Sequence, residues 1–264
     1  MKKRTNRIWE IDFLRGLSIL LMVFDHFMYY LMTIPYIFSN YHNAPSFIET
    51  LVKFANNYWN SSLRFYGHIV FVTIFLLLVG ISCHFSKNNL KRGLQIFGVG
   101  VLISIVTFIL AKLGFDDVFI LFGILHLIGT GILLSCLLEL IPGNKLWFVS
   151  VGVIIFMIGL NYNMYYPQGV NDIKDVETLI EVLIGLKAFG ADSFGLFFVG
   201  LIFIGVFIGK TIYDNRKSLL PFFDGKWNKP ICFVGRNTLV VYVVSPVILY
   251  VLIFIVCLCS GLRL

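Results

Sequence analysis

Apolar runs of about 20 residues recur along the whole chain and constrain its fold more than any other feature. A helix needs about that length to cross the hydrocarbon core of a bilayer. Hydrophobic residues make up 58% of the sequence and charged residues 13%, whereas about a quarter of a soluble domain is charged. Transmembrane β-strands would instead alternate over segments of about 10 residues. We therefore predict an all-α, polytopic membrane bundle.

The apolar runs predict seven transmembrane helices. No internal repeat or low-complexity tract divides the sequence, so we expect one transmembrane domain over residues 1–264. The predicted spans are 12–34, 64–84, 93–111, 118–141, 146–163, 193–212 and 232–257.

The distribution of basic residues predicts the orientation of these helices. If the N-terminus is cytoplasmic, most of the 21 lysines and arginines fall in inner segments, as the positive-inside rule requires. The outer segments then hold most of the acidic residues. We predict a cytoplasmic N-terminus, an external C-terminus, no cleaved signal peptide, and a location in the cell membrane, which we expect to be a bacterial plasma membrane. This argument uses Lys2, Lys3, Arg4 and Arg7 on the inner side and Asp116 and Asp117 on the outer side.

Two other classes of function are disfavoured. The net charge of +7 is accounted for by topology, and the basic residues form no aromatic-interleaved patch, so we expect no nucleic-acid partner. The cysteines do not form a CxxC motif, and we interpret them as apolar fillers rather than disulfide or zinc residues. The histidines show no HxxxH spacing, and we expect no metal. The five cysteines are Cys83, Cys136, Cys232, Cys257 and Cys259.

The stretch LRGLSILLMVFDHF (residues 14–27) of the first predicted span contains an arginine, an aspartate and a histidine: Arg15, Asp25 and His26. Eleven helical steps leave Arg15 and His26 within about 20° of one another and about 16 Å apart along the axis. Asp12 is three residues before Arg15, so the two side chains can pair. Asp25 lies about 100° around the helix from His26.

Each of these residues also has a structural interpretation. Arg15 can be a snorkelling anchor paired with Asp12, and His26 can form an interhelical hydrogen bond that stabilises the bundle. A carboxylate deep in a span is costly and usually faces a polar cavity or a partner. The adjacent Asp25 and His26 therefore favour a functional site.

Two further histidines occupy predicted spans. His68 lies near the outer end of the second span and His126 lies eight residues into the fourth. In the predicted topology both share the outer half of the membrane with His26. Glycines 123, 129 and 131 flank His126, and such small residues permit close helix approach. Each histidine alone could be a packing residue.

Two outer segments are longer than connectors require. Residues 35–63 are rich in Tyr, Asn and Ser, and residues 164–192 contain ETLIEVLIGLKAFG. That apolar stretch is too short to span and predicts an interfacial or re-entrant helix. Long loops are often functional, although a helix that merely caps the bundle is equally consistent.

Five stretches resemble one known family. They are RIWEIDFLRGLSILLMVFDH, FLLLVGISCHFSK, LKRGLQIFGVGVLISIVTF, FGILHLIGTGILLS and VGRNTLVVYVVSPVIL. In this order they resemble the heparan-α-glucosaminide N-acetyltransferase-like membrane proteins over most of the chain. The spacing of Arg15 and His26 is also similar to an R-x10-H pattern of the acyltransferase-3 membrane enzymes. Both resemblances imply transfer of an acyl group, acetyl being the simplest, from cytoplasmic acyl-CoA to an acceptor across the membrane.

The resemblance implies functional roles for Arg15, His26 and His126. Acyl transfer requires a general base and a donor for the oxyanion. We assign His26 as base or acyl relay, Asp25 as its orienting carboxylate, His126 as oxyanion donor or second base, and His68 as acceptor-binding residue. The phosphates of acyl-CoA would bind to cations at the cytoplasmic face of the membrane. The positive-inside rule alone also explains the presence of these cations. The candidate cations are Arg15, Lys87, Lys91, Arg92 and Arg236.

Two stretches depart from the pattern of that family. ADSFGLFFVG lacks its prolines and tryptophan, and Ser245 stands where its last-span histidine would be. Two alternatives to an acyltransferase remain. One is a proton-coupled transporter or flippase, and the other is a non-catalytic protein that retains the fold. Carriers usually show inverted repeats and broken helices. The expected partners are the lipid bilayer, acyl-CoA and an extracytoplasmic acceptor such as a cell-surface sugar. The sequence is also compatible with a homo-oligomer.

Overall fold

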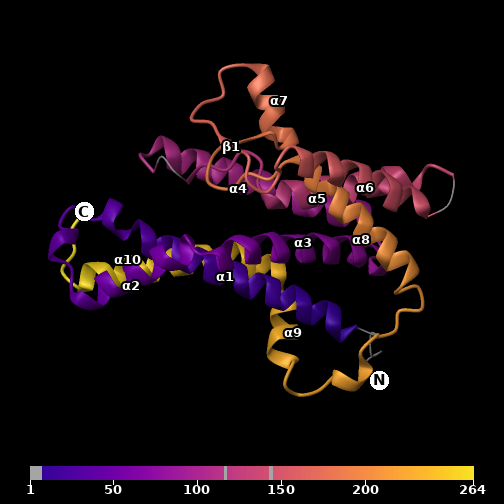
Figure 1. Ribbon diagram of the computed structural model, residues 1–264, viewed down its shortest axis with the longest axis horizontal. Coiled ribbons are helices and arrows are strands. Elements are labelled where there is room, and N and C mark those ends of the chain that lie inside the picture. The colour runs from indigo at the N-terminus through magenta and orange to yellow at the C-terminus, as the bar shows by residue number, and fades with distance from the viewer. Residues whose placement is uncertain (1–7, 116–117, 143–144) are drawn as a thin grey trace. The chain divides into compact units, whose positions relative to one another are not determined.

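The computed structural model describes residues 8–115, 118–142 and 145–264 (Figure 1). Helices make up most of this part of the chain, which confirms the all-α prediction. The basic residues Lys2, Lys3, Arg4 and Arg7, and the acids Asp116 and Asp117, lie outside the described residues. Two compact units are present: residues 1–75 with 218–264 form unit 1, and residues 76–217 form unit 2.

Each predicted span overlaps an apolar helix in the described part of the chain, although several ends differ. Four of these helices are long and apolar enough to cross a membrane: α1 (Trp9–Ile37), α3 (Ser62–Phe85), α4 (Asn89–Lys112) and α10 (Thr238–Cys259). Three are shorter: α5 (Ile124–Glu139), α6 (Leu146–Asn161) and α8 (Val199–Thr211), which continues a 3-10 turn, η3 (Leu196–Phe198). The chain is a multi-pass membrane protein. The remaining elements are η1 (Tyr41–Asn43), α2 (Ser46–Trp59), β1 (Gln168–Gly169), α7 (Val176–Ile184), β2 (Lys187–Ala188), η4 (Pro221–Phe223) and α9 (Lys229–Arg236).

The fourth and sixth helices begin later than their apolar runs. Residues before α5 are extended and pair with the segment that precedes η3: the Ala191 amide donates to the Phe119 carbonyl at 2.8 Å, and the Phe194 amide to that of Phe122 at 3.1 Å. The backbone amides and carbonyls of these apolar residues therefore form hydrogen bonds without being part of a helix. Hydropathy alone does not detect such pairing.

The seventh apolar run forms two helices rather than one. Asn237 separates α9 from α10 and has non-helical dihedral angles (φ −115°, ψ 28°). Its side chain donates to the Phe233 carbonyl at 2.8 Å, which occupies a carbonyl at the end of α9. The break places α9 across the start of α1 (Figure 1).

Unit 1 packs α2, α9 and α10 around α1. The contact of α1 with α9 is made by backbone: a Cβ atom on Gly16 would collide with the Ile231 carbonyl, and one on Gly235 with the Asp12 carbonyl. Near the other end of α1, an apolar core joins α1, α2 and α10. Its buried members are Met28, Leu31, Ile34, Phe38, Ile48, Val52, Ala55, Cys257 and Leu262.

Unit 2 pairs α4 with α5, α6 with α8, and α5 with α8. A Cβ atom on Gly129 would collide with Phe97 of α4, and one on Gly131 with Ile202 of α8. The prediction that glycines near His126 permit close helix approach is therefore confirmed for Gly129, whose neighbour is the Phe97 backbone. A larger residue there would separate α5 from α4.

The predicted short helix in residues 164–192 is α7. Asp175 caps it by accepting from the Thr178 amide at 2.6 Å, and this hydrogen bond lowers the pKa of the Asp175 carboxyl. Gly185 ends the helix in the left-handed conformation (φ 103°), as glycine commonly does. Lys187 pairs with Glu181 at 2.6 Å. With only 9 residues, α7 is too short to span.

Candidate active site

His26 is half-buried on α1 and is oriented by the backbone. Its Nδ1 lies 2.9 Å from the Met22 carbonyl oxygen, one turn earlier. A carbonyl only accepts hydrogen bonds, so Nδ1 carries the proton in the neutral ring and Nε2 keeps its lone pair. His26 is therefore set up to accept a proton at Nε2.

Asp25 pairs with an arginine from another helix. Its carboxylate accepts two hydrogen bonds from Arg64 of α3, at 3.3 Å from Nε and 3.0 Å from Nη2. The Tyr58 hydroxyl of α2 donates a third at 3.0 Å. The Met22 carbonyl, rather than Asp25, fixes the His26 ring, so the geometry does not support Asp25 as its orienting carboxylate.

Arg64 is held on two sides. Its guanidinium carbon lies 4.0 Å from the centre of the Trp59 ring, an attractive cation–π contact. The Arg64 and Asp25 side chains are 15% and 21% exposed, so the pair is largely removed from solvent. Burial, followed by the charge of Asp25, raises the pKa of Tyr58 to about 12. Tyr58 therefore remains a hydrogen-bond donor at neutral pH.

His68 belongs to the same group of residues. It lies four residues after Arg64 on α3, a spacing that puts both on one helix face. It is half-buried and interacts electrostatically with Arg64 and Asp25. We call Asp25, His26, Tyr58, Arg64 and His68 the unit 1 polar cluster. Interactions link Asp25 and His68 of the predicted catalytic residues through Arg64, and His26 follows Asp25 on α1.

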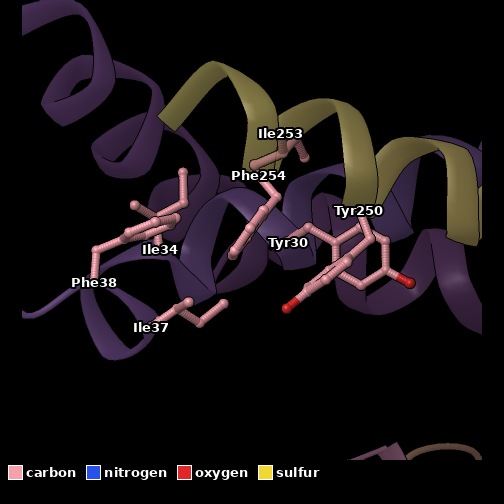
Figure 2. A pocket seen from close by; sticks show the side chains of 7 residues that line it. All are labelled: Tyr30, Ile34, Ile37, Phe38, Tyr250, Ile253 and Phe254. Carbon is pink, nitrogen blue, oxygen red and sulfur yellow. The ribbon is translucent and has the colours of Figure 1, made fainter. Parts of the chain in front are cut away.

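A small apolar pocket lies between α1 and α10 in unit 1 (Figure 2). Tyr30 stands at its edge, and its ring centre is 6.3 Å from that of His26. The lining is almost entirely apolar, although Tyr30 and Tyr250 carry hydroxyls. The lining residues are Tyr30, Ile34, Ile37, Phe38, Tyr250, Ile253 and Phe254.

His126 has a different environment in unit 2. It is the third residue of α5 rather than eight residues into a helix, and it is 5% exposed. Nδ1 accepts from the Gly123 amide at 3.3 Å, and Nε2 lies 3.4 Å from Ser104 Oγ. Phe122 stacks on the ring with centres 5.4 Å apart. Because both ring nitrogens have partners, the geometry favours the packing and capping interpretation of His126.

The five predicted donor-binding cations fall into two groups. In unit 1, Asp12 pairs with Arg15 at 3.5 Å, which confirms the predicted pair, and with Arg236 at 3.0 Å. Arg15 also donates to the Gly235 carbonyl at 3.2 Å. In unit 2, Lys87 and Lys91 are exposed. Arg92 is half-buried, with Nη1 4.0 Å from Cys83 Sγ.

Sequence reasoning missed Arg64 and Tyr58. Arg64 is the first residue of the second predicted span, and Tyr58 lies in the outer segment 35–63, for which no helix is predicted. The available signal was Asp25 itself, because a carboxylate in a span requires a partner. Within the described residues, no group of three His, Cys, Asp or Glu side chains is arranged to hold a metal ion.

Several helices are apolar and long enough to cross a membrane, which defines a multi-pass membrane protein. Its unit 1 contains a polar cluster with a histidine, an ion pair and a tyrosine. A sequence model of the family described as heparan-alpha-glucosaminide N-acetyltransferase, catalytic, matches residues 7–247. The chain belongs to this family, which implies transferase activity. No curated protein and no solved structure matches the chain.

Proposed function

We propose that the protein is a membrane acetyltransferase that moves an acetyl group from cytoplasmic acetyl-CoA to an amine or hydroxyl on the opposite side, such as that of a cell-surface sugar. The observation that carries the proposal is the state of His26, whose Nε2 is left with a lone pair by the Nδ1 contact to Met22. Membership of the family supports the reaction class.

In this mechanism His26 acts as the general base. The acceptor nitrogen or oxygen attacks the thioester carbonyl while His26 Nε2 takes its proton. The tetrahedral intermediate then collapses, the carbon–sulfur bond breaks, and the CoA thiolate leaves. The proton held by His26 passes to that thiolate, so the ring returns to its starting state.

The remaining cluster residues act on the acceptor side. Tyr58 and Arg64 fix the Asp25 carboxylate, and Arg64 compensates its negative charge. His68, one turn along α3 from Arg64, is the candidate for contacting the acceptor. His126 is assigned here to holding the start of α5 rather than to the reaction.

The donor phosphates are assigned chiefly to unit 2. Asp12 already neutralises part of the charge on Arg15 and Arg236. Lys87, Lys91 and Arg92 form no ion pair with another described residue. Uncompensated cations attract phosphate more strongly, so we rank these three above the two arginines of unit 1.

The first test uses the purified protein in nanodiscs. Acetyl-CoA binding is measured by calorimetry, and CoA release with a thiol reagent, in the presence of amino sugars. Replacing His26 with Ala should reduce release by about 100-fold or more and leave acetyl-CoA affinity within a few-fold of the wild type. Failure of the wild type to bind acetyl-CoA would contradict the proposal.

A second candidate function rests on the Asp25–Arg64 pair. Ionisable residues inside spans are also the elements of proton-coupled carriers. A carrier would move solute across proteoliposomes without acetyl-CoA, and Asp25→Asn would abolish that flux. Solute movement that requires acetyl-CoA and yields acetylated product supports the transferase instead.

A further inference from the structure

An exposed aromatic loop lies beside the start of α1 in unit 1. We call residues 218–229 the Phe222 loop. Phe222 is 91% exposed, Phe223 57% and Trp227 59%. Surface patches of this kind mark protein or membrane contacts in soluble proteins. The loop follows Lys217 and leads into α9, outside the helices of membrane-spanning length.

Hydrogen bonds to α1 hold this loop in one conformation. The Glu10 carboxylate accepts from Ser218 Oγ at 2.8 Å and from the Leu219 amide at 2.7 Å. Trp9 Nε1 donates to the Leu220 carbonyl at 3.0 Å. Glu10 is itself buried. Because the buried Glu10 carboxylate accepts two hydrogen bonds from the loop, it fixes the conformation of the loop.

The far half of the loop is fixed as well. Asn228, 1% exposed, donates to the Asp224 carboxylate at 3.2 Å. Trp227 Nε1 donates to the Phe223 carbonyl at 3.0 Å, and its ring meets the edge of Phe13 with centres 5.3 Å apart. The phenyl rings of Phe222 and Phe223 are therefore displayed by an ordered scaffold.

The charge around these rings is basic. Lys226 and Lys229 are exposed and form no ion pair with another described residue. The acid within the loop, Asp224, accepts a hydrogen bond from the neutral amide of Asn228 and keeps its negative charge. Arg236, farther along α9, is neutralised in part by Asp12. Two lysines against one carboxylate leave a net positive charge beside Phe222.

We propose that the Phe222 loop binds anionic phospholipid headgroups of the leaflet at which α1 begins, the cytoplasmic leaflet in the predicted orientation. Phe222, Phe223 and Trp227 insert at the level where aromatic residues concentrate in bilayers. Lys226 and Lys229 meet the negative headgroups. The loop is thereby an anchor that ties the start of α1 and α9 to the membrane surface.

Hydrogen exchange of the full chain in nanodiscs tests this surface. Discs of phosphatidylcholine alone are compared with discs containing equal parts of phosphatidylcholine and phosphatidylglycerol. We expect the amides of residues 218–229 to exchange more slowly in the anionic discs, by about fivefold for each lysine engaged. The double variant Lys226→Gln/Lys229→Gln should exchange at one rate in both kinds of disc.

A matched variant controls for net charge. Lys53 and Lys174 are exposed in the predicted outer segments, and Lys53→Gln/Lys174→Gln removes the same charge without touching the loop. It should keep the wild-type response to phosphatidylglycerol. Equal protection in both lipids for the wild type would overturn the proposal. Protection that rises with the number of protein copies per disc, whatever the lipid, would also overturn it and make a second copy the occupant.

Discussion

At the residue scale, the Asp25–Arg64 pair determines what the first apolar helix can do. A lone carboxylate in a span is costly, and here Arg64, Tyr58 and the Trp59 ring share the compensation. The partners lie 33 and 39 residues away in sequence. Composition predicts that Asp25 needs a partner, but only tertiary packing selects which one.

Breaking this pair should destabilise the protein. Asp25→Asn or Arg64→Gln leaves one largely desolvated charge uncompensated, at a cost of about 2 kcal/mol. The double variant should recover part of that loss, and thermal unfolding of all four proteins in detergent gives the coupling. Lys187→Gln, at the more exposed Lys187–Glu181 pair, should lower the melting temperature much less, because solvent screens surface ion pairs. Additive single effects would show that the two residues are not coupled.

His26 and His126 should respond in opposite ways to replacement. His126→Ala removes a buried ring and the acceptor of the Gly123 amide, so we expect a loss of about 2–3 kcal/mol in stability and little change in turnover per folded molecule. His26→Ala should abolish turnover and barely change the melting temperature. A stable but inactive His126→Ala would place that ring in the reaction.

At the element scale, helix identity follows from hydropathy and helix ends do not. Each of the seven apolar runs contains a helix, as its length and composition predict. Three ends moved for local reasons: extended pairing before α5, the 3-10 turn before α8, and Asn237 between α9 and α10. Such backbone hydrogen bonds leave no periodic signal in the sequence.

The crossing of α1 and α9 gives a prediction at this scale. Gly235→Ala would press a methyl group into the Asp12 carbonyl, at a cost of about 1–3 kcal/mol. Gly98 on α4 has open space around its Cβ position, so Gly98→Ala should stabilise the helix by about 0.5–1 kcal/mol. Melting temperatures of both variants test the pair. A neutral Gly235→Ala would mean that the two helices can separate at no cost.

Ser245 is a position at which this chain differs from the family pattern, and replacing it tests whether the difference matters. Its hydroxyl is buried and has no hydrogen-bond partner among the described residues, at the position where the resembled family has a histidine. Ser245→Ala removes an unsatisfied polar group and should raise the melting temperature slightly. A marked loss of turnover with no loss of stability would show that this hydroxyl meets the substrate.

At the scale of the whole molecule, each unit supplies a separate part of the proposed reaction. Unit 1 holds the proposed base and the polar cluster, and unit 2 holds the three uncompensated cations. The sequence predicts an inner position for those cations and an outer position for His26 and His68.

The most direct test is a sided transfer assay. Proteoliposomes are loaded with glucosamine or, as the hydroxyl-only control, glucose, and isotopically labelled acetyl-CoA is added outside. A membrane-impermeant reagent that modifies lysines inhibits only those protein copies whose donor-binding face is outside the vesicle, and so identifies them. We predict labelled acetylated sugar inside the vesicles for the wild type and its absence for His26→Ala. Label that stays on CoA with both sugars, while unmodified sugar leaks out at a protein-dependent rate, would contradict the transferase and indicate a carrier.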